Sequence, residues 1–179
     1  MISVYLLLDF NNFIKQKSMI RNVTPADAKA ITDIYNQYIL NTTISFETEP
    51  LTAEQMGERI KDISTEYPYY VYENEDGTIG GYCYAHRWKE REAYSHTLET
   101  TIYLAPGIER RGIGTQLMHM LINECRHRGF VALIACITGD NEASIKMHAS
   151  LGFEQKSCFE KVGIKFGKML DVVDMELLL

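Results

Sequence analysis

Residues 97–121 predict a strand, a glycine turn and a helix in direct succession. Thr100 to Leu104 is β-branched, aromatic and apolar, which is typical of a strand. Ala105-Pro106-Gly107 ends this strand, because proline lacks the ladder N–H and glycine accepts a turn. Apolar residues then recur at helical spacing from Ile113 onward. The turn between strand and helix therefore lies at a helix N-terminus.

This turn, Arg110-Arg111-Gly112-Ile113-Gly114, has the features of an anion site. N–H groups in the first turn of a helix lack intrahelical partners, and the helix dipole favours an anion. The two glycines let a phosphate approach the backbone, and the two arginines add positive charge. The spacing matches neither a P-loop, since Thr115 follows Gly114, nor a dinucleotide fingerprint, since Leu117 replaces the third glycine. Alone, the pattern favours an ordinary strand–helix turn beside a solvated arginine pair.

Composition and charge restrict the function classes. The 179 residues carry a net charge of −6, which does not favour nucleic acid or anionic membranes as partners. A hydrophobic fraction of 46% argues against disorder, and the length suits one domain with a real core. No apolar run is long enough to span a membrane, and we expect a cytoplasmic protein.

The cysteines show neither a C-x-x-C pattern nor a nearby histidine pair. This spacing argues against a metal site and against a disulfide framework. We therefore expect four reduced core residues: Cys83, Cys125, Cys136 and Cys158.

The first 18 residues differ from the rest of the chain. The apolar run Val4–Leu8 is followed by Asp9 and preceded by no basic segment, which makes a poor signal peptide. Met19-Ile20-Arg21 resembles a second start. We therefore expect residues 1–18 to be an N-terminal extension, from an upstream start or from cloning, and residues 19–179 to form the domain. A helical arm that docks on a partner is the alternative interpretation.

Strand and helix signals alternate along residues 19–179. An antiparallel first half precedes a βαβα second half, which predicts a mixed α/β layer fold. Capping patterns mark helix starts at Thr24-Pro25-Ala26-Asp27, at Thr52 with Gln55 and at Asn141. The predicted strands span residues 20–23, 69–73, 79–86, 100–104, 131–137, 153–159 and 169–178, and the predicted helices span 24–41, 52–64, 113–128 and 141–152.

Two motifs resemble those of the GNAT acetyltransferase superfamily. Glu109-Arg110-Arg111-Gly112-Ile113-Gly114 follows the acyl-CoA loop pattern Arg/Gln-x-x-Gly-x-Gly/Ala, although Glu109 stands where a basic or amide residue is usual. Asn141-x-x-Ser144-x-x-x-His148-x-x-x-Gly152-Phe153 matches the later helix motif. The resemblance implies an α/β GNAT (acyl-CoA N-acyltransferase) fold, with a mixed, mostly antiparallel central sheet and helices on both faces.

Within that superfamily the chain resembles the phosphinothricin and methionine sulfoximine N-acetyltransferases. The matching pieces are Ser45–Pro50, Trp88–Tyr94, Glu99–Tyr103, Lys146–His148 and Gly163–Val172, with Met169 where the family often has tryptophan. This likeness implies transfer of the acetyl group of acetyl-CoA to the amino group of a small amino acid. It also implies a homodimer and no metal, and the apolar segment Met175–Leu179 is a candidate interface.

The resemblance also implies how acetyl-CoA binds. The strand backbone would pair with the pantetheine arm, the glycine turn would hold the pyrophosphate, and Asn141 would bond the pantetheine. For Ile102 and Leu104, core packing is compatible with this role, since side chains pack while the backbone binds. The implied cofactor-binding residues are Ile102, Tyr103, Leu104, Arg110, Arg111, Gly112, Ile113, Gly114, Thr115, Asn141 and Ser150.

Two residues are candidates for catalysis. Glu99 is placed to take a proton from the acceptor ammonium, and its alternative is a strand-edge glutamate paired with a basic residue. His148 stands where many superfamily members have a tyrosine that protonates the thiolate, and its alternative is a histidine packed near the sheet. No role is assigned to the remaining histidines, of which the last two are expected to be solvated: His86, His96, His119 and His127.

A basic and aromatic loop precedes Glu99. Lys89, Arg91 and Tyr94 suit a carboxylate or a phosphinate, which arginine binds bidentately, and the alternative is a charged surface loop. Phe46 is a candidate pocket wall or a core residue. The implied substrate-binding residues are Phe46, Lys89, Arg91, Tyr94, Glu99, Thr100 and Thr101.

Three other functions are compatible with the sequence. The same fold and co-substrate would serve a polyamine, an aminoglycoside or a protein N-terminus as acceptor. A non-catalytic acyl-CoA-binding domain is the second alternative, and the presence of Glu99 argues against it. A pure interaction module, which would bind no CoA, is the third.

Overall fold

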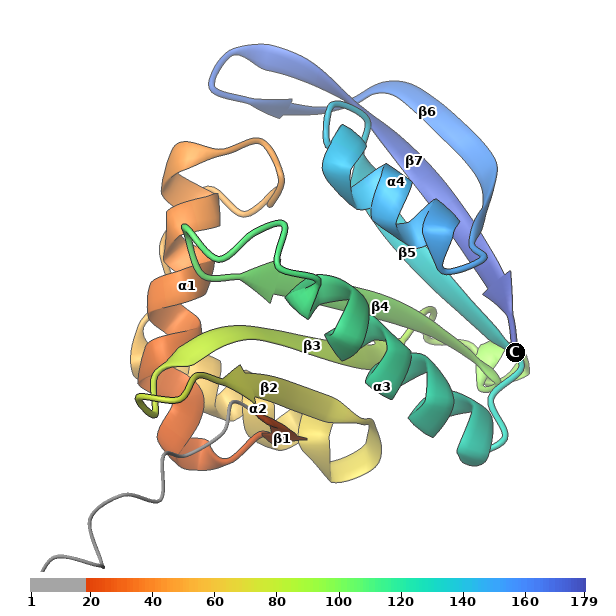
Figure 1. Ribbon diagram of the computed structural model, residues 1–179. Helices are drawn as coiled ribbons and strands as arrows, with labels where there is room; N and C mark the ends of the chain where they lie inside the picture. Colours follow the sequence, from red (N-terminus) through yellow and green to blue (C-terminus); the bar gives the residue numbers. More distant parts are fainter. Residues whose placement is uncertain (1–18) are drawn as a thin grey trace, which may run out of the picture.

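The computed structural model describes residues 19–179, and the expected N-terminal extension lies outside the described residues. Within this range seven strands form one sheet in the order β1-β2-β3-β4-β5-β7-β6 (Figure 1). All neighbouring strands are antiparallel except β4 and β5, which confirms the mixed, mostly antiparallel sheet. The strands are β1 Met19–Asn22, β2 Tyr69–Glu73, β3 Ile79–Arg87, β4 Thr97–Leu104, β5 Ala132–Thr138, β6 Glu154–Lys165 and β7 Lys168–Leu178.

Helices cover both faces of the sheet, as expected. α1 (Ala28–Asn41) and α2 (Ala53–Glu66) lie on one face, and α3 (Ile113–His127) and α4 (Glu142–Ser150) lie on the other (Figure 1). The two faces bury separate apolar clusters, one under α1 and α2 and one under α3. Short 3-10 turns span Pro25–Asp27 and Glu92–Tyr94. Among residues 19–179 no helix is long and apolar enough to cross a membrane.

The predicted capping box before α1 is present and anchors the helix to the sheet. The Thr24 amide donates to Asp27 Oδ2 at 2.7 Å. The Arg21 guanidinium on β1 donates two bonds to Asp27, each at 2.8 Å, and Arg21 Nε lies 2.6 Å from Glu73 Oε2 on β2. Asp27 is 6% exposed. One buried carboxylate therefore joins the first strand to the start of the first helix.

β4 and β5 form a parallel ladder of only three residue pairs. They pair at Thr97–Ala132, Leu98–Leu133 and Glu99–Ile134, and then diverge (Figure 1). The Thr100 hydroxyl donates to the Ile134 carbonyl at 3.3 Å beside the fork. Beyond Glu99, the edge of β4 that faces β5 pairs with no other strand of residues 19–179.

The predicted end of the sixth strand is wrong. We expected residues 153–159, but β6 continues to Lys165 through a bulge between Phe159 and Gly163. Lys161 has a left-handed φ of 57°, and its amide donates to Asp171 Oδ1 at 2.8 Å. Residues 160–162 therefore form a bulge within a strand and do not end it.

Two cysteines contradict the expectation of four core residues. Cys83 and Cys125 are buried, whereas Cys136 and Cys158 are exposed. Cys158 lies on the edge strand β6. Cys136 lies on β5 beyond the last pair with β4, and its thiol donates to Asp174 Oδ1 at 3.0 Å. The divergence of β5 from β4 exposes a position that an apolar strand pattern assigns to the core.

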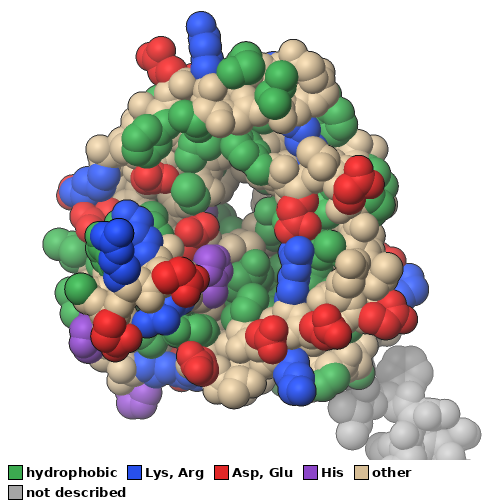
Figure 2. Space-filling model, turned by 180° about the vertical axis from the view of Figure 1, so that it is seen from behind, with side chains coloured by type: hydrophobic (Ala, Val, Ile, Leu, Met, Phe, Trp, Pro, Cys, Tyr) green, Lys and Arg blue, Asp and Glu red, His purple; other side chains and the backbone are tan. Residues whose placement is uncertain are grey.

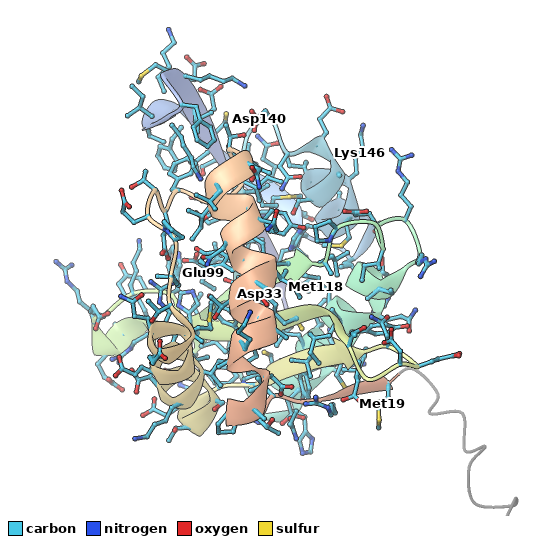
Figure 3. All side chains as sticks on the ribbon, turned by 90° about the vertical axis from the view of Figure 1, so that its left-hand side faces the viewer. Met19, Asp33, Glu99, Met118, Asp140 and Lys146 are labelled. Atoms are coloured by element: carbon cyan, nitrogen blue, oxygen red, sulfur yellow. The ribbon has the colours of Figure 1, made fainter. Side chains whose placement is uncertain are left out.

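Asp27→Asn should destabilise the fold, because it removes a charge-assisted network shared by β1 and α1. We expect a loss of about 2 kcal/mol in the free energy of unfolding, measured by urea denaturation at neutral pH. Asp33→Asn is the matched control, because its partner Lys29 lies at 2.6 Å but the Asp33 side chain is 61% exposed on the outside of α1 (Figure 3). Equal losses in the two variants would contradict the assignment.

The same network sets a pH dependence. Burial alone would raise the pKa of Asp27, but hydrogen bonds from Arg21 and Thr24 lower it overall below its ordinary value of 3.8. A lowered folded pKa stabilises the fold above pH 3.8, and this contribution is lost as the pH falls through the folded pKa. The difference in the free energy of unfolding between wild type and Asp27→Asn should therefore shrink as the pH falls below 3.8.

Candidate active site

A cavity of about 130 Å³ opens where β4 and β5 diverge. Figure 2 shows the molecule hollowed near its centre, with hydrophobic and acidic side chains and a histidine at the rim. Residues of β4, β5 and α4 supply most of its wall, and Ile44 from a loop and Asn141 at the N-cap of α4 complete it. The lining residues are Ile44, Glu99, Thr100, Thr101, Ile102, Tyr103, Ala135, Cys136, Ile137, Thr138, Asn141, Ser144 and His148.

Glu99 lies at the fork of the two strands. It is the last β4 residue paired with β5, and its side chain is 28% exposed (Figure 3). Burial raises the pKa of this carboxyl above its ordinary value, the nearby His86 opposes that effect, and Asp174 adds to it. A carboxylate with a raised pKa is a better proton acceptor near neutral pH. The alternative interpretation was a glutamate paired with an arginine or a lysine. Among the described residues, Glu99 forms no such salt bridge, and its charged neighbour is His86.

His148 on α4 is 2% exposed and lines the cavity. Its Nδ1 lies 2.9 Å from the Ser144 carbonyl oxygen. Because a carbonyl oxygen only accepts, Nδ1 carries the proton and Nε2 holds a lone pair. Nε2 is the buried side-chain nitrogen or oxygen that lacks a hydrogen-bond partner in residues 19–179. Burial lowers the pKa of His148, which favours the neutral ring and its acceptor nitrogen.

The first turn of α3 has the backbone shape of an anion site. Gly112 caps the helix with a left-handed φ of 75°, and Arg110 has a left-handed φ of 63°. Left-handed residues in a turn form concavities of backbone N–H groups, and these add to the free N–H groups of the helix. The side chains of Arg110 and Arg111 are exposed beside this turn.

The other residues of the glycine turn have different surroundings. A Cβ on Gly114 would lie 3.1 Å from Met147 Sδ, so this glycine allows α3 and α4 to pack closely. Ile113 is 4% exposed, and only its backbone is available to a ligand. Glu109 Oε2 accepts the Gly107 amide at 3.0 Å. The residue that departs from the family pattern thus folds back on its own loop.

Only some of the remaining predicted cofactor residues line the cavity. Ile102, Tyr103 and Asn141 line the cavity, and Asn141 Oδ1 also caps α4 by accepting the Ser144 amide at 3.2 Å. The Leu104 carbonyl, at the end of β4, accepts the Tyr38 hydroxyl at 2.8 Å. Ser150 lies at the other end of α4, exposed and outside the cavity lining. Thr115 is in the first turn of α3.

The predicted substrate residues are only partly together. Glu99, Thr100 and Thr101 line the cavity. Phe46 lies outside its lining and is 45% exposed, and its ring packs directly against the backbone of Gly163. The loop between β3 and β4 holds the others, outside the lining: Lys89, Arg91 and Tyr94.

That loop forms a cation–aromatic cluster. Lys89 Nζ lies 3.9 Å from the centroid of the Trp88 ring and 5.1 Å from that of Tyr94. The Trp88 and Tyr94 rings meet edge to face at 5.3 Å. These contacts hold the basic side chain at the end of the sheet nearest Glu99, because the loop joins β3 directly to β4.

Sequence reasoning missed the contribution of β5. Cys136 and Thr138 line the cavity, as does Ile44 from the loop after α1. Ligands in α/β sheets bind outside the carboxyl ends of strands, and this rule would have pointed to Thr138. His86, which lies beside Glu99, also had no role predicted from the sequence. Within residues 19–179, no three His, Cys, Asp or Glu side chains cluster as a metal site.

Several known proteins are similar to this chain in sequence and in fold. The family model for the acetyltransferase (GNAT) domain matches residues 20–173. A phosphinothricin N-acetyltransferase from Alcaligenes faecalis is 39% identical over 88% of this chain and 80% of its own length. The L-methionine sulfoximine/L-methionine sulfone acetyltransferase of Salmonella typhimurium is 34% identical over 88% and 92%.

A solved structure agrees with these relatives. The phosphinothricin acetyltransferase of Sinorhizobium meliloti, in complex with acetyl-CoA, superimposes with a TM-score of 0.88 at 35% identity. The match covers 91% of this chain and 89% of that one. The fold expected from the glycine turn and the helix motif is therefore confirmed. The chain belongs to the GNAT acetyltransferase family and is an acetyl-CoA-dependent N-acetyltransferase.

Proposed function

We propose that this enzyme acetylates the amino group of a small amino acid of the phosphinothricin or methionine sulfoximine type, with Glu99 as general base. The observation that carries the proposal is the half-buried Glu99 carboxylate, with its raised pKa, at the fork that opens into the cavity. The names of the relatives support the acceptor class.

Acetyl-CoA would lie along the unpaired edge of β4. The first turn of α3 would hold the pyrophosphate on its N–H groups, with Arg110 and Arg111 beside it. Backbone groups of Ile102 to Leu104 would pair with the pantetheine amides as an added strand does. Asn141 faces the same cavity and supplies its amide NH₂, since its oxygen caps α4. These residues fit the co-substrate because they offer backbone donors, local positive charge and an open strand edge.

The reaction needs a neutral amine and stabilisation of charge on the thioester oxygen. Glu99 takes a proton from the acceptor ammonium, directly or through one water, so that the amine attacks the thioester carbonyl. Backbone N–H groups near Tyr103 and Leu104 stabilise the developing negative charge. His148 holds no proton on Nε2 to give to the thiolate, so it acts as a hydrogen-bond acceptor and water supplies that proton.

The acceptor carboxylate would meet the loop between β3 and β4. Arg91 is exposed there, and Lys89 is held by two aromatic rings. Both lie on the loop that leads into Glu99, where an amino acid bound by its amino group would extend its acidic groups. Arginine binds carboxylate and phosphinate in a bidentate manner.

We also propose that the enzyme is a homodimer. Large apolar side chains are exposed along the β6–β7 hairpin, and such patches mark interaction surfaces. They are Phe159, Val162, Ile164, Phe166 and Met169. At the end of β7, by comparison, Met175 is 2% exposed and Leu178 is the exposed large apolar side chain, so the hairpin offers the larger apolar surface.

An acceptor panel tests the proposed substrate. Thiol release from acetyl-CoA would be measured with phosphinothricin, methionine sulfoximine, common amino acids, a polyamine, an aminoglycoside and a peptide with a free N-terminus. We expect the first two acceptors to give the highest kcat/KM. Preference for the polyamine, aminoglycoside or peptide would move the enzyme to another acceptor class. Acetyl-CoA binding without thiol release for any amine would favour the binding-domain alternative.

Glu99→Gln should lower kcat/KM by about 10²-fold or more, because the amide accepts no proton. The matched control is Glu124→Gln, since Glu124 on α3 has a similar exposed fraction, 29%, and is paired with Arg128. In the wild type, kcat/KM should rise with pH through a pKa above the ordinary glutamate value of 4.5. Near-normal turnover of Glu99→Gln would remove Glu99 as the base.

Gly112→Ala should raise the KM for acetyl-CoA about tenfold, the equivalent of about 1.4 kcal/mol, because a methyl group enters the proposed pyrophosphate turn. Gly129→Ala is the control, because Gly129 has the same left-handed backbone, with φ of 81°, at the other end of α3. Each variant should lose about 1 kcal/mol of stability from backbone strain. If both raise the KM equally, the effect is strain alone and the turn is not the cradle.

Val162→Lys should convert a dimer to a monomer, as measured by light scattering after size-exclusion chromatography. A charge in the centre of an apolar interface must be desolvated on association. Val131→Lys is matched in exposure, 56% against 58%, but lies outside the hairpin and should leave the dimer intact. A wild type that is monomeric at micromolar concentration would rule out the proposed dimer.

A further inference from the structure

His86 lies directly opposite Glu99 in the sheet. The two residues are paired across the antiparallel strands β3 and β4, so their side chains leave the sheet on the same face. His86 Nε2 is 3.9 Å from Glu99 Oε1. The two side chains are 33% and 28% exposed, so the pair lies between the cavity and solvent.

The other ring nitrogen of His86 determines what Nε2 can do. Nδ1 lies 2.9 Å from the Arg87 carbonyl oxygen, and a carbonyl oxygen only accepts, so Nδ1 carries a proton. In the neutral ring, Nε2 therefore presents a lone pair to Glu99. In the imidazolium, Nε2 becomes a donor to the same carboxylate. The Tyr84 ring, 5.7 Å from the imidazole, supports this orientation.

We propose that His86 is a positioning residue that receives the proton taken up by Glu99 and returns Glu99 to its ionised form. The inference rests on the proposed role of Glu99 as general base. The O–H bond of the Glu99 carboxyl breaks, an N–H bond forms at His86 Nε2, and the imidazolium then releases that proton to solvent water. The two atoms, Glu99 Oε1 and His86 Nε2, are 3.9 Å apart. The proton crosses this distance through one bridging water or after a small rotation of either side chain.

Of the groups around Glu99, His86 is the one that favours the ionised form of the Glu99 carboxyl. Asp174 on β7 and Cys136 on β5 face Glu99 from the far side, and Tyr84 faces it from β3. Asp174 is negative and disfavours a second carboxylate nearby. Among these neighbours, His86 is the one that lowers the pKa of Glu99, because a positive imidazolium favours the carboxylate. When protonated, it stabilises the Glu99 carboxylate and keeps the base active at lower pH.

The sign of the effect follows from this arrangement. Without the imidazolium, the Glu99 carboxyl holds its proton up to a higher pH, so the acid limb of kcat/KM against pH should move upward. A shift of about half a pH unit corresponds to about a threefold loss of activity on that limb. His86→Gln, which keeps a neutral polar side chain, and His86→Ala should both show this loss, with little change at the plateau.

The experiment compares three variants with the best acceptor from the panel. His119→Ala removes an exposed histidine from α3 and should keep the wild-type profile. Added imidazole should restore activity to His86→Ala, where it can occupy the vacated space, and should not affect His86→Gln. A wild-type profile for His86→Gln, or no response of His86→Ala to imidazole, would overturn the inference.

A titration of the free protein separates this inference from the proposed function. The pKa of the Glu99 carboxyl, followed by carbon NMR, should be higher in His86→Gln than in the wild type, whatever the acceptor. An unchanged Glu99 pKa overturns the role of His86 while leaving Glu99→Gln to decide the base. If Glu99→Gln is fully active, the proposed base fails independently of the titration.

Discussion

The parallel pairing of β4 with β5 over three residues is the constraint on which the rest of the structure depends. It is long enough to join two halves of one sheet, with Leu98 and Leu133 buried at the junction. It is also short enough to leave the rest of β4 with an unpaired edge and to open a cavity beside it. Glu99 is the last paired residue, so the position of the proposed base is set by the backbone at the fork.

The site keeps polar groups in surroundings that do not fully satisfy them. Among the described residues, His148 Nε2 is buried without a hydrogen-bond partner, and burial raises the pKa of the Glu99 carboxyl. Both conditions cost free energy that the apolar clusters on the two faces of the sheet must supply. Such costs are tolerated at functional sites, where a ligand completes the missing contacts. The buried network around Asp27, by contrast, is fully satisfied and lies in the half of the sheet that carries α1.

Local features were predictable from the sequence, and long-range ones were not. The capping boxes at Thr24 and Thr52 depend on a few neighbouring residues. The exposure of Cys136 depends on where β5 leaves β4, which no single strand pattern contains. The place of Phe46 against Gly163 depends on a contact between the first third of the chain and the last hairpin. His86 was overlooked for the same reason, since only the register of β3 and β4 brings it to Glu99.

The loop after α1 is held by residues from the other end of the chain. The Thr138 hydroxyl donates to the Thr43 carbonyl at 3.0 Å, Asp140 accepts from both Thr43 and Lys168, and Lys165 donates to the Ser45 carbonyl. Ile44, between these anchors, lines the cavity. The wall of the site is therefore formed by contacts between the N-terminal and C-terminal parts of the domain. Deleting the last two strands would remove the Lys165 and Lys168 contacts that help to hold this loop, which lies more than a hundred residues earlier in the chain. Shortening the domain from its C-terminus should therefore disturb the wall of the site.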